Sequence, residues 1–462
     1  MARGSNWERR TLSIAIFVGL VATVFCKKEE VPIQPAEQQE AMEKRWVVVL
    51  EEGEFKHSID ATYWEPGTDH FWIECVDGYI DSMRRNNGGT KISYVYLWQG
   101  EDTIDYYLDE YHLLNINDVP CGIDLRYVPA DSVPEPFLIT TAIVRPEQVL
   151  QLEKFPNLAV LNTNRFDDDY LPALSGLKNL QLLSLRRSRK KSQYSPGITD
   201  EGMKNLEGLT NLRVLDLSFT RISGEGLAYL KNLSELRELN IYHTFMALED
   251  SGFKHLKAFP GLRKLQCNVY SHPDQALRHI GELTGLEELY LEGLDITSFN
   301  MRHLEGLTNL RVLRLSVTDV GSYGVRYLKD MVHLRELSLA FSEVGNSGLI
   351  HLSGLVNLEV LDLMETRVSS TGLRHLAGLT ELRELDLGET RVGNRRLEKI
   401  SHLTNLRSLS LFDTPITDKG LKHLEGLTNL KKLNLAKTKV TRQGIAELQE
   451  ALPDCKISYW VD

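Results

Sequence analysis

Histidine is the residue type whose spacing most readily suggests chemistry in this sequence. Five histidines precede a leucine at intervals of 24 residues or multiples of 24, and they are His255, His303, His351, His375 and His423. A row of imidazoles could hold zinc, which needs its nitrogen ligands within about 2.1 Å. The surrounding leucines predict helices, however, and neighbouring helices pack about 8 to 10 Å apart. We therefore expect packed or solvated histidines, no metal site and no cofactor.

Acidic residues recur with the same spacing and could bind a basic partner. Glu365, Glu389 and Asp413 are 24 residues apart, as are Asp362 and Asp386. If the repeats are in register, these side chains stack about one strand spacing, ~4.8 Å, apart. Like charges that close disfavour joint ionisation unless a cation lies between them. We expect a basic protein segment or a bound cation to relieve the repulsion; the alternative is a screened, solvated acidic face.

Aromatic residues occupy neighbouring positions that the same register exposes. They are Phe219, Tyr242, Tyr290, Phe341 and Phe412. Exposed aromatic side chains are frequent anchors of protein interfaces. Together with the acidic residues they form the predicted partner-binding set, whereas the alternative treats them as isolated surface residues.

Sequence motifs of the common catalytic sites are absent from the chain. It contains no GxSxG, GxxxxGK, HExxH or DxDxDG pattern, which nucleophilic, phosphate-binding, zinc and calcium sites use at those spacings. We therefore predict no catalytic residues and no enzyme. An activity of unknown class within residues 46–145, with the repeats as a targeting arm, stays open as the alternative.

The net charge argues against nucleic acid as a partner. The chain carries a formal charge of −11 at pH 7, whereas proteins that bind a phosphate backbone normally carry a dominant basic face. One basic cluster stands out, with five cations from Arg186 to Lys191. We interpret it as a solvated loop, with contact to an anionic surface as the alternative.

The N-terminal segment predicts export. Three arginines precede an uncharged apolar run from Leu12 to Phe25, and two lysines follow it. This order is typical of an export signal or a short membrane anchor, here residues 1–26. Cys26 resembles the lipidated cysteine of bacterial lipoproteins and is a candidate for lipidation, with an uncleaved anchor as the alternative. We expect an exported, membrane-tethered protein.

Two folded parts are expected after a polar linker at residues 27–45, which cannot bury enough apolar surface to fold alone. Residues 46–145 contain four of the six tryptophans and the strand-like runs RWVVVL and KISYVYLW. These runs predict a small α+β or β-rich domain of unknown type. Cys75 and Cys121 lie within it and could pair in an oxidising compartment. Residues 146–462 are governed by repetition.

Leucine recurs with a strict period in that last part. Leucines stand every 24 residues from Leu262 to Leu430, and the register extends back to Leu158, giving about twelve units. Each has the form L-x-x-L-x-L-x-x-T-x-(I/V), followed by G-L-x-x-L-x-x-L. The first half alternates with period two, as in a strand with one buried face, and the second half has helical spacing. One unit cannot bury its own leucines, so the units must stack.

This pattern resembles the leucine-rich-repeat family, and it is closest to the 24-residue units of many exported bacterial proteins and of the repeat half of F-box adaptors. The resemblance implies an α/β solenoid, a horseshoe with parallel strands on its concave side and helices on its convex side. It also makes a protein the expected ligand of the concave face, and a bacterial cell envelope or periplasm the expected location. An F-box-like adaptor is a further alternative, which the export segment opposes.

Some positions depart from the family pattern. Threonine replaces the asparagine that many relatives carry in the turn, for instance at Thr390; its hydroxyl can still bond the turn backbone, though more weakly. Arg396 replaces the glycine that usually begins the helix, so we expect that helix to start differently. Cys267 takes the place of a buried leucine, and the final segment LPDCKISYW should form a closing strand.

Overall fold

The computed structural model describes residues 46–52, 55–61, 94–99, 102–108, 113–116, 119–124, 141–163, 166–186, 197–244, 250–269, 272–292 and 295–460. The predicted export segment with Cys26, the linker at 27–45 and Cys75 lie outside these ranges, as do the side chain of Cys121 and the basic loop beyond Arg186. Among the described residues, no helix is long and apolar enough to cross a bilayer. The predicted domain boundary at residue 146 stays a prediction.

The chain divides into two compact units, residues 1–166 with 176–184 and residues 167–175 with 185–462. The first unit is described mainly as strands: β1 (Trp46–Glu52), β2 (Phe55–Ala61), β3 (Tyr94–Gln99), β4 (Asp102–Leu108), β5 (Leu113–Ile116), β6 (Val119–Asp124), β7 (Thr141–Val144), β8 (Val160–Thr163) and β9 (Leu182–Ser184), with the 3₁₀ helix η5 (Pro146–Lys154). Strand β1 pairs antiparallel with β2 and β3, and the antiparallel order continues through β6. Strands β6 to β9 pair in parallel. The two runs predicted as strands overlap β1 and β3.

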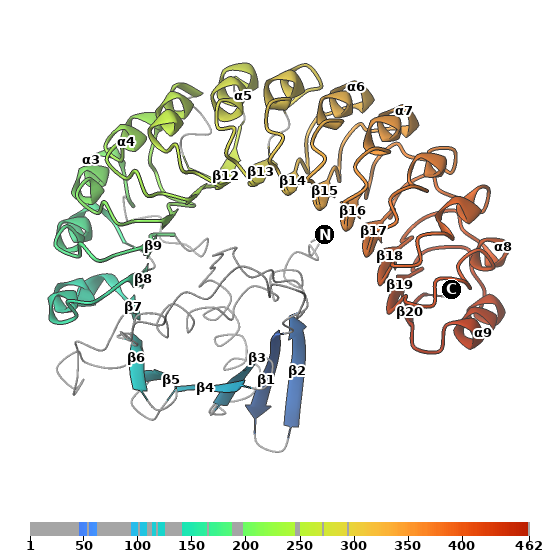
Figure 1. Cartoon of the computed structure of the whole chain (residues 1–462), viewed down its shortest axis with the longest axis horizontal. Coiled ribbons are helices and arrows are strands. Elements are labelled where there is room, and N and C mark those ends of the chain that lie inside the picture. Colours follow the sequence, from blue (N-terminus) through green and yellow to red (C-terminus); the bar gives the residue numbers. More distant parts are fainter. Residues whose placement is uncertain are drawn as a thin grey trace, which may run out of the picture. The chain divides into compact units, whose positions relative to one another are not determined.

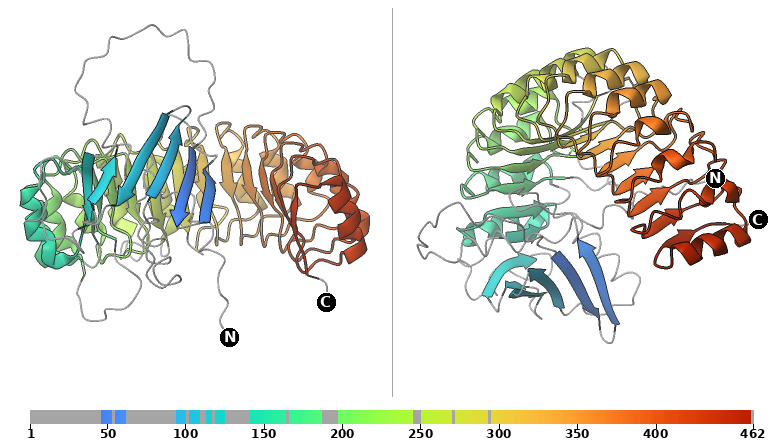
Figure 2. Two further views of the ribbon diagram at one scale, coloured as in Figure 1. Left: turned by 90° about the horizontal axis from the view of Figure 1, so that it is seen from below. Right: turned by 45° about the vertical axis from the view of Figure 1, so that its right-hand side comes forward.

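The second unit is built on a parallel sheet whose strands come one from each repeat. These are β10 (Val214–Asp216), β11 (Glu238–Ile241), β12 (Lys264–Asn268), β13 (Glu288–Glu292), β14 (Val312–Arg314), β15 (Glu336–Ser338), β16 (Val360–Asp362), β17 (Glu384–Asp386), β18 (Ser408–Ser410), β19 (Lys432–Asn434) and β20 (Lys456–Ser458). Each strand pairs in parallel with the next, for example Asp362 with Asp386. Within this unit the strands line the inner side of an arc and the helices its outer side (Figure 1), and Figure 2 shows the same strand order from two other directions.

The outer side of the second unit consists of short α-helices and 3₁₀ turns. They are η6 (Asp168–Leu174), α3 (Asp200–Met203), η7 (Lys204–Leu206), α4 (Gly224–Ala228), η9 (Asp250–Ala258), α5 (Pro273–Gly281), η10 (Asn300–Leu304), α6 (Ser322–Val325), η11 (Arg326–Leu328), α7 (Asn346–Leu349), η12 (Ile350–Leu352), η13 (Leu373–His375), η14 (Leu397–Ile400), α8 (Asp418–Leu421) and α9 (Arg442–Ala451). The leucines in these segments are three residues apart, which matches the three residues per turn of a 3₁₀ helix. The expected α/β solenoid is therefore confirmed.

Stacked leucines form the core between the strands and the helices. Each repeat leucine from Leu158 to Leu430 exposes at most 2% of its surface. Cys267 is buried in a leucine position, as predicted, and both Cys267 and Cys455 are free thiols. The predicted closing strand is β20, whose Ile457 pairs with Leu433 of β19.

The threonines of the turn act within their own repeat. The hydroxyl of Thr390 donates a 2.6 Å hydrogen bond to the carbonyl of Leu387, and Thr414 makes the same bond to Leu411. Equivalent bonds recur at Thr220, Thr244, Thr318, Thr366 and Thr438. The expectation that threonine would bond the turn backbone is confirmed.

Polar side chains that precede or begin the helices tie one repeat to the next. The Oδ1 atom of Asn394 accepts a 2.9 Å bond from the backbone N–H of Thr417, and Asp418 accepts from Thr441 in the same way. A Cβ on Gly420 would lie 2.6 Å from Asn394 Oδ1, so a glycine is required there. At the equivalent position Arg396 has a φ of 65° and is followed by the 3₁₀ helix η14. That helix does start differently, as predicted.

Candidate binding face

Alternation along each strand decides which side chains reach the inner face. In β16, Leu361 is buried in the core, whereas Val360 and Asp362 on the other side of the strand are half-buried. We count positions from the repeat leucine, so that Asp386 is the fourth residue and Glu389 the seventh residue after Leu382. The structure places the fourth and seventh residues in two distinct environments.

The fourth residue is used by its own turn when it is Asp or Asn. The Oδ1 atom of Asp386 accepts a 2.8 Å bond from the backbone N–H of Gly388, and Asp362 accepts from Met364. Asn240 and Asn434 make the same bond two residues onward. A side chain that bonds the backbone two residues ahead is a common way to fix a turn. Asp362 also accepts a bond from the hydroxyl of Ser338, so the two predicted binding aspartates have a structural role.

The seventh residue adopts left-handed backbone geometry in repeat after repeat. The residues, which we call the left-handed row, are Phe219, His243, Val317, Phe341, Glu365, Glu389, Asp413 and Lys437, with φ between 50° and 60°. In several of them the backbone N–H turns toward the next repeat: Glu365 donates to the carbonyl of Gly388 and Glu389 to that of Phe412. Positive φ is uncommon for residues other than glycine.

The left-handed row brings three of the predicted acidic residues together. Glu365, Glu389 and Asp413 lie in consecutive repeats, and all three are exposed. Asp413 pairs with Lys437, whose Nζ lies 3.6 Å from its carboxylate. Glu365 and Glu389 form no ion pair with the residues that the structure describes.

The predicted aromatic residues do not form one cluster. Phe219 and Tyr242 meet edge to face at 5.8 Å, with His243 against both rings and Arg186 over the ring of Phe219. Phe341 is 41% exposed, and the half-buried ring of Phe412 lies 4.8 Å from the Nζ of Lys437. Of the five predicted aromatic residues, all of which the structure describes, Phe341 alone is exposed.

Tyr290 instead belongs to a cluster of charges on the inner face. Its hydroxyl donates a 2.9 Å bond to Glu288, and Lys264 and Arg314 lie over its ring at 5.4 and 5.2 Å. Burial, reinforced by the charge of Glu288, raises the pKa of Tyr290 well above its ordinary value. The phenol therefore stays neutral and acts as a hydrogen-bond donor.

A basic feature of the same face was missed in the sequence. Arginine directly follows the repeat leucine at seven positions, which we call the arginine row: Arg213, Arg237, Arg263, Arg311, Arg335, Arg383 and Arg407. Two glutamates at the same place pair with them. Glu287 lies 2.9 Å from Arg263 and 3.6 Å from Arg311. The signal is present in the sequence as spacings of 24, 26 or 48 residues between these arginines.

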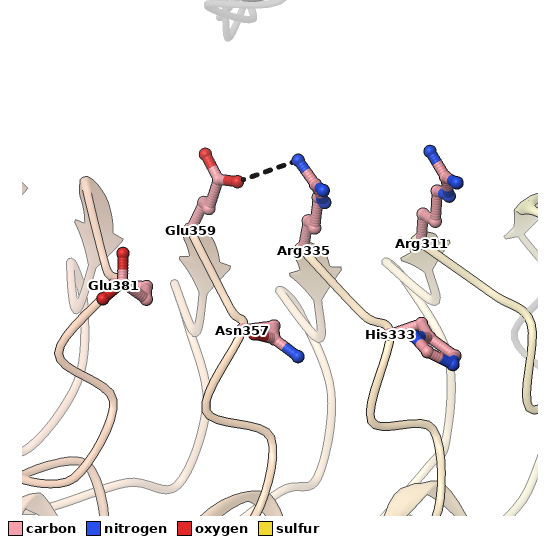
Figure 3. A pocket seen from close by; sticks show the side chains of 6 residues that line it. All are labelled: Arg311, His333, Arg335, Asn357, Glu359 and Glu381. Carbon is pink, nitrogen blue, oxygen red and sulfur yellow. Dashed lines mark hydrogen bonds and ion pairs between the residues drawn. The ribbon is translucent and has the colours of Figure 1, made fainter. Parts of the chain in front are cut away.

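Part of the arginine row borders a hollow of about 300 Å³. Arg311, Arg335 and Glu359 project side by side above His333 and Asn357, with Glu381 at one end (Figure 3). Glu359 lies 3.4 Å from both Arg335 and Arg383. The cations of the arginine row thus lie directly before the strands, whereas the carboxylates of the left-handed row lie after them.

The five recurring histidines are half-buried; four of them lie in helical segments and His423 lies in the turn after α8. His303 bonds Asp274 at 2.8 Å, which with the nearby arginines holds the pKa of that carboxyl below its usual range. Burial lowers the pKa of His255 and His375. In the described ranges, no three His, Cys, Asp or Glu residues are grouped to hold a metal ion. The arrangement offers charged and aromatic surfaces for binding.

Comparisons with known proteins agree with the fold. A family model described as Leucine Rich repeat matches residues 208–231, 331–353 and 402–424. A crystal structure of an internalin from Listeria monocytogenes is 23% identical, with a TM-score of 0.50 over 68% of this chain and 83% of that chain. A leucine-rich-repeat protein from Leptospira interrogans is 16% identical, with a TM-score of 0.43 over 71% and 98% of the two chains. No curated protein sequence matches this chain.

Proposed function

Since the chain is a leucine-rich-repeat protein, we propose that it is a non-catalytic recognition protein that binds a protein partner through the inner face of its repeats. Proteins built from such repeats commonly mediate protein–protein interactions, which supports this class of ligand. The observation that carries the proposal is the stacking of exposed Glu365, Glu389 and Asp413 in consecutive repeats. Like charges held so close favour a partner that brings cations.

The surroundings of these carboxylates support a protein rather than a lone cation. Phe341 lies one repeat before Glu365 and is 41% exposed, and Phe412 directly precedes Asp413. Aromatic anchors beside charged groups are typical of the residues that dominate protein interfaces. The proposed binding face also includes the other predicted contacts, Phe219, Tyr242 and Tyr290, which lie in earlier repeats.

Export and membrane tethering belong to the same proposal. They rest on the apolar run after three arginines and on Cys26 as a lipidation candidate. A tethered chain would present its repeats outside the cytoplasm, where an acidic face and a basic partner attract one another over about 8 Å at physiological salt.

The test is capture of proteins from a cell-envelope extract by the immobilised full-length chain, at low and high salt, with identification by mass spectrometry. The triple variant Glu365→Lys/Glu389→Lys/Asp413→Lys should lose a partner that the wild type retains and that high salt releases. The matched control, Glu305→Lys/Glu425→Lys/Glu450→Lys, changes three exposed glutamates outside the row and should retain it. Equal retention by both variants would remove the acidic residues from the site. If the wild type retains no protein but binds or converts a small molecule, the alternative of an enzyme at residues 46–145 takes first place.

A further inference from the structure

Side chains persist in the left-handed row although the backbone there favours glycine. In left-handed geometry Cβ lies too close to the following carbonyl oxygen, which only glycine avoids. Val317, with a φ of 60°, is β-branched, the type for which such geometry is a true outlier. Eight residues of the row share the geometry, so it is a property of the repeat and not an isolated distortion.

In the middle of the row the backbone, and not the side chain, fixes the position. The bond that fixes the position comes from the backbone, as when the N–H of Phe341 donates to the carbonyl of Met364 and that of Val317 to Ala340. Glycine would make the same bond. Val317 and Phe341 are 38% and 41% exposed, and Glu365 and Glu389 are also exposed. Residues held in strained backbone geometry cluster at functional sites.

The chemistry of the row changes in order along the repeats. It runs from Val317 and Phe341, which are apolar, to Glu365 and Glu389, which are acidic. Among the residues that the structure describes, neither glutamate has an ion-pair partner. The apolar pair calls for an apolar side chain, and the acidic pair calls for Lys or Arg.

We infer that the part of the left-handed row from Val317 to Glu389 is the specificity-determining surface, and that it takes a short protein segment with apolar residues followed by basic ones. This inference rests on the proposed function. The four residues lie in consecutive repeats, about 14 Å from first to last at the usual strand spacing. An extended segment of about five residues covers that length. The strained backbone presents its side chains in a fixed direction, so the order of apolar and basic residues is read as well as their charge.

The experiment uses the full-length chain and fluorescein-labelled peptides, with binding followed by fluorescence anisotropy. The probe is Phe-Leu-Ser-Lys-Lys, and the control peptides are Phe-Leu-Ser-Glu-Glu and Ser-Ser-Ser-Lys-Lys. We expect the probe to bind at least tenfold more tightly than either control. The double variant Glu365→Gly/Glu389→Gly should lose at least tenfold in affinity for the probe.

Thermal stability provides the second readout. The same glycine variant should melt on the order of 1 to 3 °C higher than the wild type, because strain is relieved at two positions. The matched control is Glu305→Gly/Glu425→Gly, which also removes two exposed carboxylates. Glu305 has right-handed geometry, with a φ of −54°, so this control should melt lower and bind the probe as the wild type does.

Each contrary result has a distinct meaning. A lower melting temperature for Glu365→Gly/Glu389→Gly would show that the side chains serve the fold, and it would overturn the inference. Unchanged probe affinity in that variant would do the same. If the wild type self-associates in sedimentation and the variant does not, the occupant is a second copy of this chain, and the peptide assignment is wrong. None of these outcomes depends on capturing a partner from the extract, which tests the proposed function separately.

Discussion

The Nζ atom of Lys264 lies 3.0 Å from Oε2 of Glu288 on the neighbouring strand, although both side chains are almost fully buried. The same ammonium is 3.9 Å from Glu238 and stands over the ring of Tyr290. Burying a charge raises the free energy of the folded state, and removing its partner leaves that increase uncompensated. The cluster therefore makes the inner face at β11 to β13 sensitive to single substitutions.

Substitution of Lys264 tests this cluster. Lys264→Met should lower the free energy of unfolding by about 3 kcal/mol or more, because Glu288 is left without its cation. Adding Glu288→Gln should recover part of the loss. Lys432→Met changes an exposed lysine at the same place of a later repeat and should cost no more than about 0.5 kcal/mol. Urea denaturation measures all three, and equal losses for the two lysine variants would contradict the prediction.

The buried carboxyl of Asp216 predicts a pH dependence. Burial raises its pKa above the usual 3.8, although Ser218 and the charge of Arg186 oppose the shift. The neutral form is therefore favoured in the folded state, so its contribution to stability is present below the unfolded pKa and is lost as pH rises through the folded pKa. Asn occupies the same place at Asn240 and Asn434 and makes the same turn bond.

Asp216→Asn should consequently melt higher than the wild type at neutral pH. The difference in Tm should shrink as the pH falls toward and below 4, because the wild-type carboxyl then becomes protonated in the unfolded state as well as in the folded state. Calorimetry across that range measures it, with Asp319→Asn as the control at an exposed aspartate. A difference that does not vary with pH would rule out titration of Asp216 as its cause.

Removal of one turn hydroxyl should lower the stability of the fold, although the side chain changes little in size. Thr390 is buried and donates a 2.6 Å bond to the carbonyl of Leu387. Thr390→Val leaves that carbonyl without its donor and should lower the free energy of unfolding by about 1 to 3 kcal/mol. Thr404→Val, at an exposed threonine, should change it by less than about 0.5 kcal/mol. Urea unfolding of the two variants measures the difference. Equal midpoints for Thr390→Val and Thr404→Val would contradict a stabilising role of the Thr390 hydroxyl.

The glycine inside α8, Gly420, should resist substitution because of the preceding repeat. A Cβ on Gly420 would lie 2.6 Å from Asn394 Oδ1, whereas one on Gly426 would meet nothing within 4 Å. Gly420→Ala should cost about 1 to 3 kcal/mol, and Gly426→Ala should cost nothing. Combined with Asn394→Ala, the loss from Gly420→Ala should be smaller than in the wild-type background, since the contacting oxygen is gone. Strict additivity in this double-mutant cycle would show that the loss from Gly420→Ala does not come from contact with Asn394.

The repeat fold could be predicted from the sequence because its signal is local. Leucines at period two and at period three specify a strand and a turn of helix within one unit, and the same leucines must be buried between stacked units. Thus Leu361 and the repeat leucine Leu358 are in the core, as expected. The closing strand at Ile457 and the unusual helix start at Arg396 were also readable, since each is a departure from a known period.

The binding face was only partly readable, because its properties depend on the neighbouring repeat and on backbone angles. Asp362 and Asp386 were expected beside one another and are in register. Each also fixes its own turn, and this role depends on the direction of a backbone N–H, which the sequence does not show. The pairing of Arg335 and Arg383 with Glu359 joins residues 24 apart that directly precede three neighbouring strands. The sequence by itself determined which leucines are buried between the stacked repeats. Only the tertiary structure decided that Val317, Phe341, Glu365 and Glu389 stand on left-handed backbone, because the turn into the next repeat, and not the residue type, sets the sign of φ.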